Sequence, residues 1–213
     1  ARTRLAPALM LGSLQDPKDK EQLAQEMADR IGVSKEFVLE NNLRIPPSKF
    51  RKELLKNQEL VVGRFDSLMT GASLGELGGD YDPSLEAIFG AMTAAFNQYL
   101  GKELKWPEIK EYKSLVAITN WNWGKGNQYV TAYRPLKGLL IQNPDVKVLV
   151  AMGEYDLAIP SFANEYMIQH MDLSSSQNER IVIKKYPSGH MFYLNPESLV
   201  DFKKEVLILY KEK

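Results

Sequence analysis

The sequence predicts an α/β fold in which a few parallel strands are flanked by helices. Two short apolar segments, 147–152 and 180–186, are typical of strands, and helix signals lie before, between and after them. This alternation indicates a parallel sheet, because parallel strands are joined by crossovers that usually contain a helix. Asp156 follows the first strand and His190 follows the second. Both side chains are therefore expected at the carboxyl edge of one sheet.

The first third of the chain is predicted to be helical. Asp16 followed by Pro17 is a capping residue with proline at the first helical position, and Gly32 ends that helix. Ser34 and Ser48 are expected to start two further short helices. The first helix has apolar residues four positions apart, which are Leu23, Met27 and Ile31.

Residues from about 60 to 82 are interpreted as a loop because glycine recurs there. Asp82-Pro83 then repeats the capping signal, and a helix is predicted from this point to Gly101, which would end it. Further helices are predicted at about 129–141, at about 162–171 and after Asn195-Pro196. The helix after Asp82 has one apolar face, made of Leu85, Ile88, Phe89, Met92, Phe96, Tyr99 and Leu100.

Composition excludes several classes of function. Lys plus Arg and Asp plus Glu both number 27, so the net charge is zero and no nucleic-acid or anionic-membrane footprint is present. The absence of cysteine excludes disulfides, a thiol nucleophile and thiolate metal sites. No apolar run approaches about 18 residues, so no transmembrane helix is expected.

The N-terminus suggests a missing front portion. The chain begins at Ala1 rather than at a methionine, and no signal-peptide pattern follows. Two parallel strands do not form a stable sheet alone, because such sheets need several strands and cover on both faces. We therefore expect that an N-terminal portion precedes this chain in the intact protein.

Asp156 and His190 are the candidate catalytic pair. Their order and their positions after two strands match the second and third members of a Ser…Asp…His triad in an α/β-hydrolase. Histidine suits general-base work near neutral pH, and the acid fixes its tautomer. Alternatively, Asp156 is a turn residue or a helix cap and His190 is a structural loop residue. Glu154 is a rival acid, whereas His170 is expected to be an ordinary residue within a helix.

Ser73 lies in Gly71-Ala-Ser73-Leu-Gly75, which matches the Gly-x-Ser-x-Gly nucleophile pattern. A nucleophile elbow needs a strand directly before the serine and a helix directly after it. Residues 63–70 have weak strand character, and residues 76–82 are unsuitable for a helix start. We therefore interpret Ser73 as part of a flexible loop.

Several short stretches, in a consistent order, resemble one family of enzymes. Together these stretches cover most of the chain, which resembles the C-terminal half of bacterial serine carboxypeptidase-family proteins. Those proteins are α/β-hydrolases. The stretches are Asn42-Leu-Arg-Ile45, Phe50-Arg-Lys-Glu-Leu54, Val62-Gly-Arg-Phe-Asp-Ser67, Thr70-Gly71, Tyr81-Asp-Pro-Ser84, Thr93-Ala-Ala-Phe-Asn97, Gly153-Glu-Tyr-Asp156 and Gly189-His-Met191.

The resemblance implies two regions, a helical cap or insertion over 1–75 and the C-terminal part of the hydrolase core over 76–213. It implies that Asp156 and His190 are the triad acid and base and that Met191 helps to line the substrate cleft. It also implies peptide-bond hydrolysis at the C-terminus of peptides, with no metal and no organic cofactor. The resemblance also favours export from the cytoplasm, because members of the family are often exported.

The sequence departs from the family in one large respect. The Gly-Glu-Ser-Tyr-Gly elbow and the Asn-Gly-Gly-Pro-Gly oxyanion-hole segment of the family do not occur in these residues. The resemblance therefore assigns the nucleophile to an N-terminal half, and the chain by itself is expected to be inactive. Two alternatives stay open. One is a self-contained esterase or lipase that uses Ser73, and the other is a non-catalytic, hydrolase-derived module that self-associates.

Overall fold

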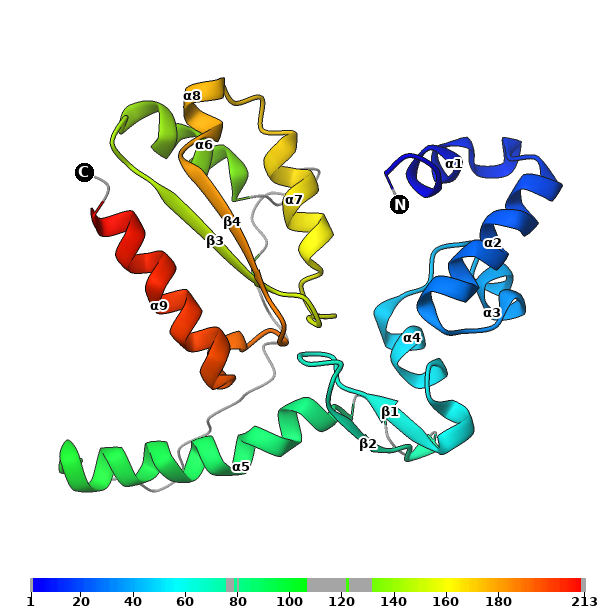
Figure 1. Cartoon of the computed structure of the whole chain (residues 1–213). Coiled ribbons are helices and arrows are strands. Elements are labelled where there is room, and N and C mark those ends of the chain that lie inside the picture. Colours follow the sequence, from blue (N-terminus) through cyan, green and yellow to red (C-terminus); the bar gives the residue numbers. More distant parts are fainter. Residues whose placement is uncertain (1, 76–78, 80, 107–121, 123–131, 212–213) are drawn as a thin grey trace. The chain divides into compact units, whose positions relative to one another are not determined.

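The computed structural model in Figure 1 describes residues 2–75, 79, 81–106, 122 and 132–211. Contacts divide the chain into two compact units. The first consists of Ala1–Val62 and Thr70–Tyr81, and the second consists of Gly63–Met69 and Asp82–Lys213. The two regions expected from the sequence, 1–75 and 76–213, refer to parts of a hydrolase and stay a prediction.

Helices make up most of the first unit, and two of them begin at the predicted caps. The Asp16 side chain accepts hydrogen bonds from the backbone N–H groups of residues 18 and 19, and Ser34 accepts one from Phe37. Gly32 ends the long helix in a left-handed conformation, with a φ of 75°. A small core of Leu23, Ala24, Ala28, Val38 and Leu43 holds these helices together. The helices are α1 (Leu5–Leu11), α2 (Pro17–Ile31), α3 (Lys35–Glu40) and α4 (Pro47–Glu53).

A short hairpin completes the first unit, where the sequence suggested only a loop. Strand β1 (Leu60–Val62) pairs antiparallel with β2 (Thr70–Ala72). The prediction was wrong here because three-residue strands are too short to show an alternating pattern. Arg51 fixes the hairpin from α4: its guanidinium is buried and donates to the backbone oxygens of Val62 and Tyr81, both at 2.8 Å.

The second unit is built on a parallel pair of strands, which confirms the predicted mixture of helices with parallel strands. Strand β3 (Val148–Gly153) pairs in register with β4 (Ile181–Tyr186), so that Val148 faces Ile181 and Gly153 faces Tyr186. Helices lie on both sides of this pair in Figure 1. They are α6 (Tyr133–Gln142), α7 (Ser161–Gln169), the short α8 (Ser175–Asn178) and α9 (Pro196–Lys211). The helix expected from about residue 129 begins at Tyr133 in the described part, and residues 129–131 lie outside it.

The two faces of the strand pair bury different helices. Apolar side chains of alternate strand residues, including Val150 and Ile183, pack against Leu140 of α6 and Ile168 of α7. The opposite face carries Tyr186, whose ring stacks on Phe192 at 4.6 Å and meets Phe202 of α9 edge-on. Strand alternation thus gives each face its own apolar cluster.

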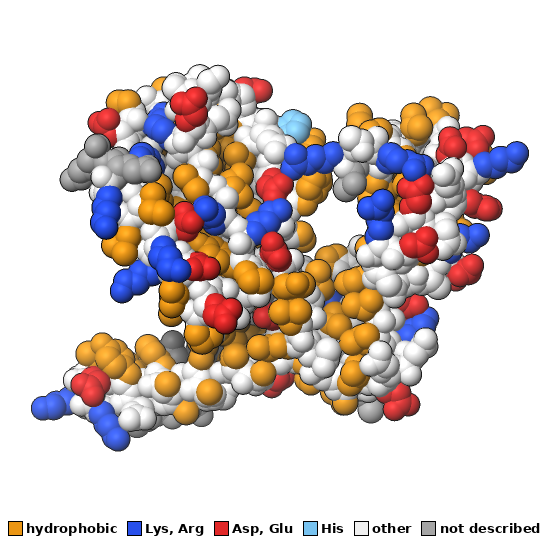
Figure 2. Space-filling view, viewed as in Figure 1, with side chains coloured by type: hydrophobic (Ala, Val, Ile, Leu, Met, Phe, Trp, Pro, Cys, Tyr) orange, Lys and Arg blue, Asp and Glu red, His pale blue; other side chains and the backbone are white. Residues whose placement is uncertain are grey.

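Helix α5 (Pro83–Gln98) begins at its predicted cap, since the Asp82 carboxylate accepts from the backbone N–H of Ser84. Its end differs from the prediction. The helix passes into a π-helical turn, η4 (Tyr99–Glu103), with Gly101 in its middle. A glycine costs a helix only about 1 kcal/mol, so it does not have to end one. Four large apolar side chains of this segment are exposed in the described structure, and Figure 2 shows apolar groups along the helix. They are Phe89, Met92, Phe96 and Tyr99.

Among the described residues, the structure contains no helix with the length and apolar character needed to span a bilayer.

Replacement of Leu140 by alanine tests the core of the second unit. The Leu140 side chain is 1 % exposed, whereas that of its neighbour Leu139 is 42 % exposed. We expect Leu140→Ala to lower the free energy of unfolding by about 3 kcal/mol and Leu139→Ala to lower it by less than about 1 kcal/mol. Denaturant unfolding followed by circular dichroism measures both. Equal losses in the two variants would contradict the packing described for α6.

Tyr186 makes the free energy of unfolding of the second unit fall as the pH rises in the alkaline range. Burial raises the pKa of the Tyr186 hydroxyl, and the nearby carboxylates of Glu205 and Asp201 raise that pKa further. Above about pH 10 the unfolded chain therefore loses this proton while the folded chain keeps it, so the free energy of unfolding falls as the pH rises.

Tyr186→Phe removes this contribution. Among the described residues the buried hydroxyl has no hydrogen-bond partner, so the variant is expected to be at least as stable as the parent at pH 9. Its stability advantage is expected to grow between about pH 9 and pH 11. Denaturant midpoints at both pH values measure the change. Tyr210→Phe, at a position that is 75 % exposed, is the control. An advantage that is the same at both pH values would disprove this origin.

Candidate active site

Asp156 is held in a tight turn just after β3. One carboxylate oxygen, Oδ1, accepts hydrogen bonds from the backbone N–H groups of Ala158 at 2.7 Å and Ile159 at 2.9 Å. The residue is 7 % exposed. These two bonds satisfy one oxygen of a buried carboxylate and fix its plane, which leaves Oδ2 to face the second loop.

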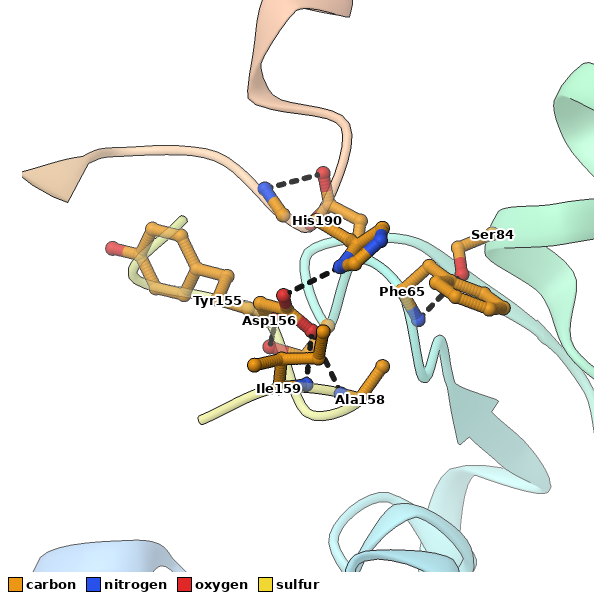
Figure 3. Close-up of polar contacts among 10 residues, drawn as sticks. Phe65, Ser84, Tyr155, Asp156, Ala158, Ile159 and His190 are labelled. Atoms are coloured by element: carbon orange, nitrogen blue, oxygen red, sulfur yellow. Dashed lines mark hydrogen bonds and ion pairs between the residues drawn. The ribbon is translucent and has the colours of Figure 1, made fainter. Parts of the chain in front are cut away.

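His190 meets this second oxygen. Nδ1 of the imidazole lies 2.8 Å from Oδ2 of Asp156, and Figure 3 shows the ring turned toward the carboxylate. A carboxylate only accepts hydrogen bonds, so Nδ1 carries the proton and donates it. The imidazole side chain is 36 % exposed and that of Asp156 is 6 % exposed. A buried acid thus orients a ring that stays accessible.

The other ring nitrogen, Nε2, is the atom that can do chemistry. With the proton on Nδ1, Nε2 has a free lone pair, and none of the described residues forms a hydrogen bond with it. A neutral imidazole with a free Nε2 and a carboxylate on Nδ1 can accept a proton and then hold the resulting positive charge. The pair is therefore equipped for general-base catalysis.

Close backbone contact brings the two strand ends together. A side chain on Gly153 would overlap the carbonyl group of Gly189, and one on Gly189 would overlap the carbonyl oxygen of Phe65. Backbone hydrogen bonds join the same segments, since the N–H of Tyr155 donates to the oxygen of Ser188 at 3.1 Å. Glycine is needed at both positions because any side chain would push the loops apart.

Phe65 and Asp66 lie where these loops cross, and no sequence signal predicts a role for either residue. The backbone N–H of His190 donates to the oxygen of Phe65 at 2.6 Å, and the N–H of Gly189 donates to Asp66 Oδ2 at 3.1 Å. The Phe65 ring meets the imidazole edge-on, with ring centroids 5.3 Å apart. A hydrogen bond to a backbone carbonyl leaves no signature in the sequence. The one signal at this segment is its Gly-Arg-Phe-Asp stretch, which forms part of the family resemblance.

Met191 borders a small cavity of about 260 Å³ next to the histidine loop. Typical ligand pockets have volumes of about 300–1,000 Å³, so this cavity is suited to one side chain rather than to a whole ligand. Its lining is mainly apolar and includes Phe65, Ile88, Met191 and Leu194. The expected contribution of Met191 to a substrate cleft stays a prediction.

The remaining candidates are Glu154, His170 and Ser73. Glu154 is exposed, and the structure pairs His190 with Asp156 rather than with this rival acid. His170 ends α7 and its ring stacks on Tyr166. Ser73 belongs to the first unit. Residues 63–69 form no strand, as expected, but strand β2 at 70–72 directly precedes Ser73, and neither Ser73 nor Leu74 is helical.

Within the described residues no group of three or more His, Asp or Glu side chains is arranged to hold a metal ion. No protein-family model, curated protein or solved structure matches this chain at a significant level. The function is therefore inferred from the geometry of the site.

Gly189→Ala tests the loop crossing. The new methyl group would overlap Phe65, so we expect lower stability and a displaced His190. Gly138→Ala is the matched control, because Gly138 lies within α6 and a methyl group there meets open space. Alanine favours a helix over glycine by about 1 kcal/mol, so this control should be slightly stabilising. Thermal unfolding and the His190 imidazole signals in NMR spectra measure both effects. Unchanged signals in Gly189→Ala would contradict the close approach.

Proposed function

We propose that this chain supplies the acid and the base of a Ser-His-Asp hydrolase of the serine carboxypeptidase type. The single observation that supports the proposal is the buried Asp156 carboxylate, which accepts from Nδ1 of His190 at 2.8 Å, while none of the described residues bonds to Nε2. Electrostatics favour this arrangement. The negative charge of Asp156 lies away from bulk water, where it stabilises an imidazolium more strongly than it would at the surface.

In the proposed reaction a serine hydroxyl gives its proton to Nε2 of His190 as its oxygen attacks a peptide carbonyl. The imidazolium then donates that proton to the leaving amine, and an acyl-enzyme remains. His190 next removes a proton from water as the water oxygen attacks the ester carbonyl. The bond from the acyl carbon to the serine oxygen then breaks, and the imidazolium returns its proton to that oxygen. Asp156 keeps the ring in the Nδ1–H tautomer throughout.

The nucleophile and the oxyanion hole would come from an N-terminal half, because the family elbow does not occur in these 213 residues. In an α/β-hydrolase core, β3 and β4 would be the strands that carry the acid and the histidine. The first unit would correspond to the helical cap. Among the described residues, exposed apolar side chains on α5 and α9, such as Met92 and Ile208, support a need for cover by this half or by a second copy.

The proposed substrate is a peptide, cleaved at its C-terminus. This choice follows the family resemblance, and the small apolar cavity at Met191 supports it, because one apolar side chain next to the scissile bond would fit there.

A self-contained esterase that uses Ser73 is the second candidate. Strand β2 directly before Ser73 favours it, as does a cavity of about 350 Å³ that this serine helps to line. The missing helix start at Ser73 and Leu74 weighs against it, because the elbow depends on that turn.

Labelling with a fluorophosphonate, followed by peptide mapping, separates the two candidates. We expect this chain alone to stay unlabelled at Ser73. When it is produced together with the polypeptide encoded upstream, we expect one serine of that polypeptide to be labelled. His190→Ala should lower the labelling rate by at least about 10⁴-fold, because the serine then has no general base.

His170→Ala is the matched control, because it removes the other histidine and should leave the labelling rate unchanged. Labelling of Ser73 in the isolated chain that disappears in His190→Ala would overturn the proposal in favour of the esterase. If the upstream polypeptide provides no reactive serine, the hydrolase proposal fails.

A further inference from the structure

The loop between β1 and β2, residues 63–69, belongs with the second unit. It contacts both segments of the candidate site, the one around Asp156 and the one that contains Gly189 and His190. On the acid side, the N–H of Ser67 donates to the oxygen of Tyr155 and the N–H of Leu157 donates to the oxygen of Arg64, both at 3.0 Å. The loop therefore fixes the backbone on either side of Asp156.

On the histidine side the same loop makes three contacts with two consecutive residues. The oxygen of Phe65 accepts from the N–H of His190, and Asp66 Oδ2 accepts from the N–H of Gly189. The Phe65 ring packs edge-on against the imidazole at an interplanar angle of 63°. Edge-to-face pairs are directional, so this contact restricts the rotation of the imidazole as well as its position.

The loop is itself anchored, which it must be if it is to hold another residue. Its N–H groups at Arg64 and Phe65 donate to the side chains of Asp82 and Ser84, at 3.0 and 3.1 Å. Ser84 is 2 % exposed and its hydroxyl donates to Asp82 at 2.6 Å. These acceptors belong to the start of α5, and Figure 3 shows Phe65 between Ser84 and His190. A rigid helix end thus supports the loop.

We propose that Phe65 and Asp66 are positioning residues for His190. Phe65 restricts the imidazole to the rotamer in which Nδ1 meets Asp156, and Asp66 fixes the backbone from which the ring projects. The significance for catalysis rests on the proposed hydrolase function, because a proton acceptor displaced by about 1 Å can lower a rate about 10²-fold. The positioning itself is a property of this chain and can be measured without a nucleophile.

Nitrogen NMR of the two imidazoles tests the proposal on the intact chain, which contains only His170 and His190. Assignment follows from His170→Ala. At about pH 9, where an ordinary histidine is neutral, His190 should show the single Nδ1–H tautomer that the bond to Asp156 requires. Asp156→Asn is the positive control, and we expect it to change that tautomer pattern.

We expect Phe65→Leu and Asp66→Ala to convert the single pattern of His190 into averaged signals from both tautomers. Phe65→Tyr keeps the ring and should keep the pattern of the parent. Leu68→Ala is the matched control in the same loop, because the Leu68 side chain is 58 % exposed, and it should also leave the pattern unchanged. The His170 signals should stay constant in all four variants.

The parent pattern in both Phe65→Leu and Asp66→Ala would overturn the proposal. Phe65→Leu nearly preserves the buried volume, so the result does not depend on a variant with a large cavity, and the dispersion of the amide spectrum shows whether each variant is folded. Failure here is separate from failure of the hydrolase proposal. The NMR result needs no reactive serine, whereas fluorophosphonate labelling requires one.

Discussion

Parallel pairing of β3 with β4 determines where an acid and a histidine can meet in this molecule. The register sets Gly153 opposite Tyr186, so both strands end at the same level and both following loops emerge at one edge. Asp156 and His190 lie three and four residues beyond these points. In an antiparallel pair the two loops would leave from opposite ends. The helices pack against both faces of the strand pair and so stabilise two strands that could not persist alone.

Satisfied hydrogen bonds turn this meeting of loops into an organised site. A buried carboxylate is costly unless its oxygens are bonded, and Asp156 has backbone donors on one oxygen and an imidazole on the other. The loop 63–69 supplies hydrogen-bond acceptors for the backbone N–H groups of Gly189 and His190. This pre-organisation is the property that a general base requires.

The sequence predicted those features that depend on local signals. Asp16, Ser34 and Asp82 cap helices where their neighbours indicated, and the apolar segments near 150 and 183 are parallel strands. Features that depend on distant contacts were missed. Strands β1 and β2 are too short for periodicity, and Phe65 acts through a backbone oxygen. The pairing of Asp156 with His190 was predictable because each follows a strand. The contacts that Phe65 and Asp66 make with Gly189 and His190, more than 100 positions away in the sequence, could not be predicted.

Exposed apolar surface is consistent with the proposal that this chain is part of a larger enzyme. In the described structure β3 and β4 pair only with each other, and Met92 of α5 and Val200 of α9 are exposed. Exposed apolar faces and unpaired strand edges favour association, so a non-catalytic module would share them with a part of a hydrolase. The proposed hydrolase function rests on the Asp156–His190 pair, because a general base depends on a fixed tautomer and on a ring nitrogen that can accept a proton.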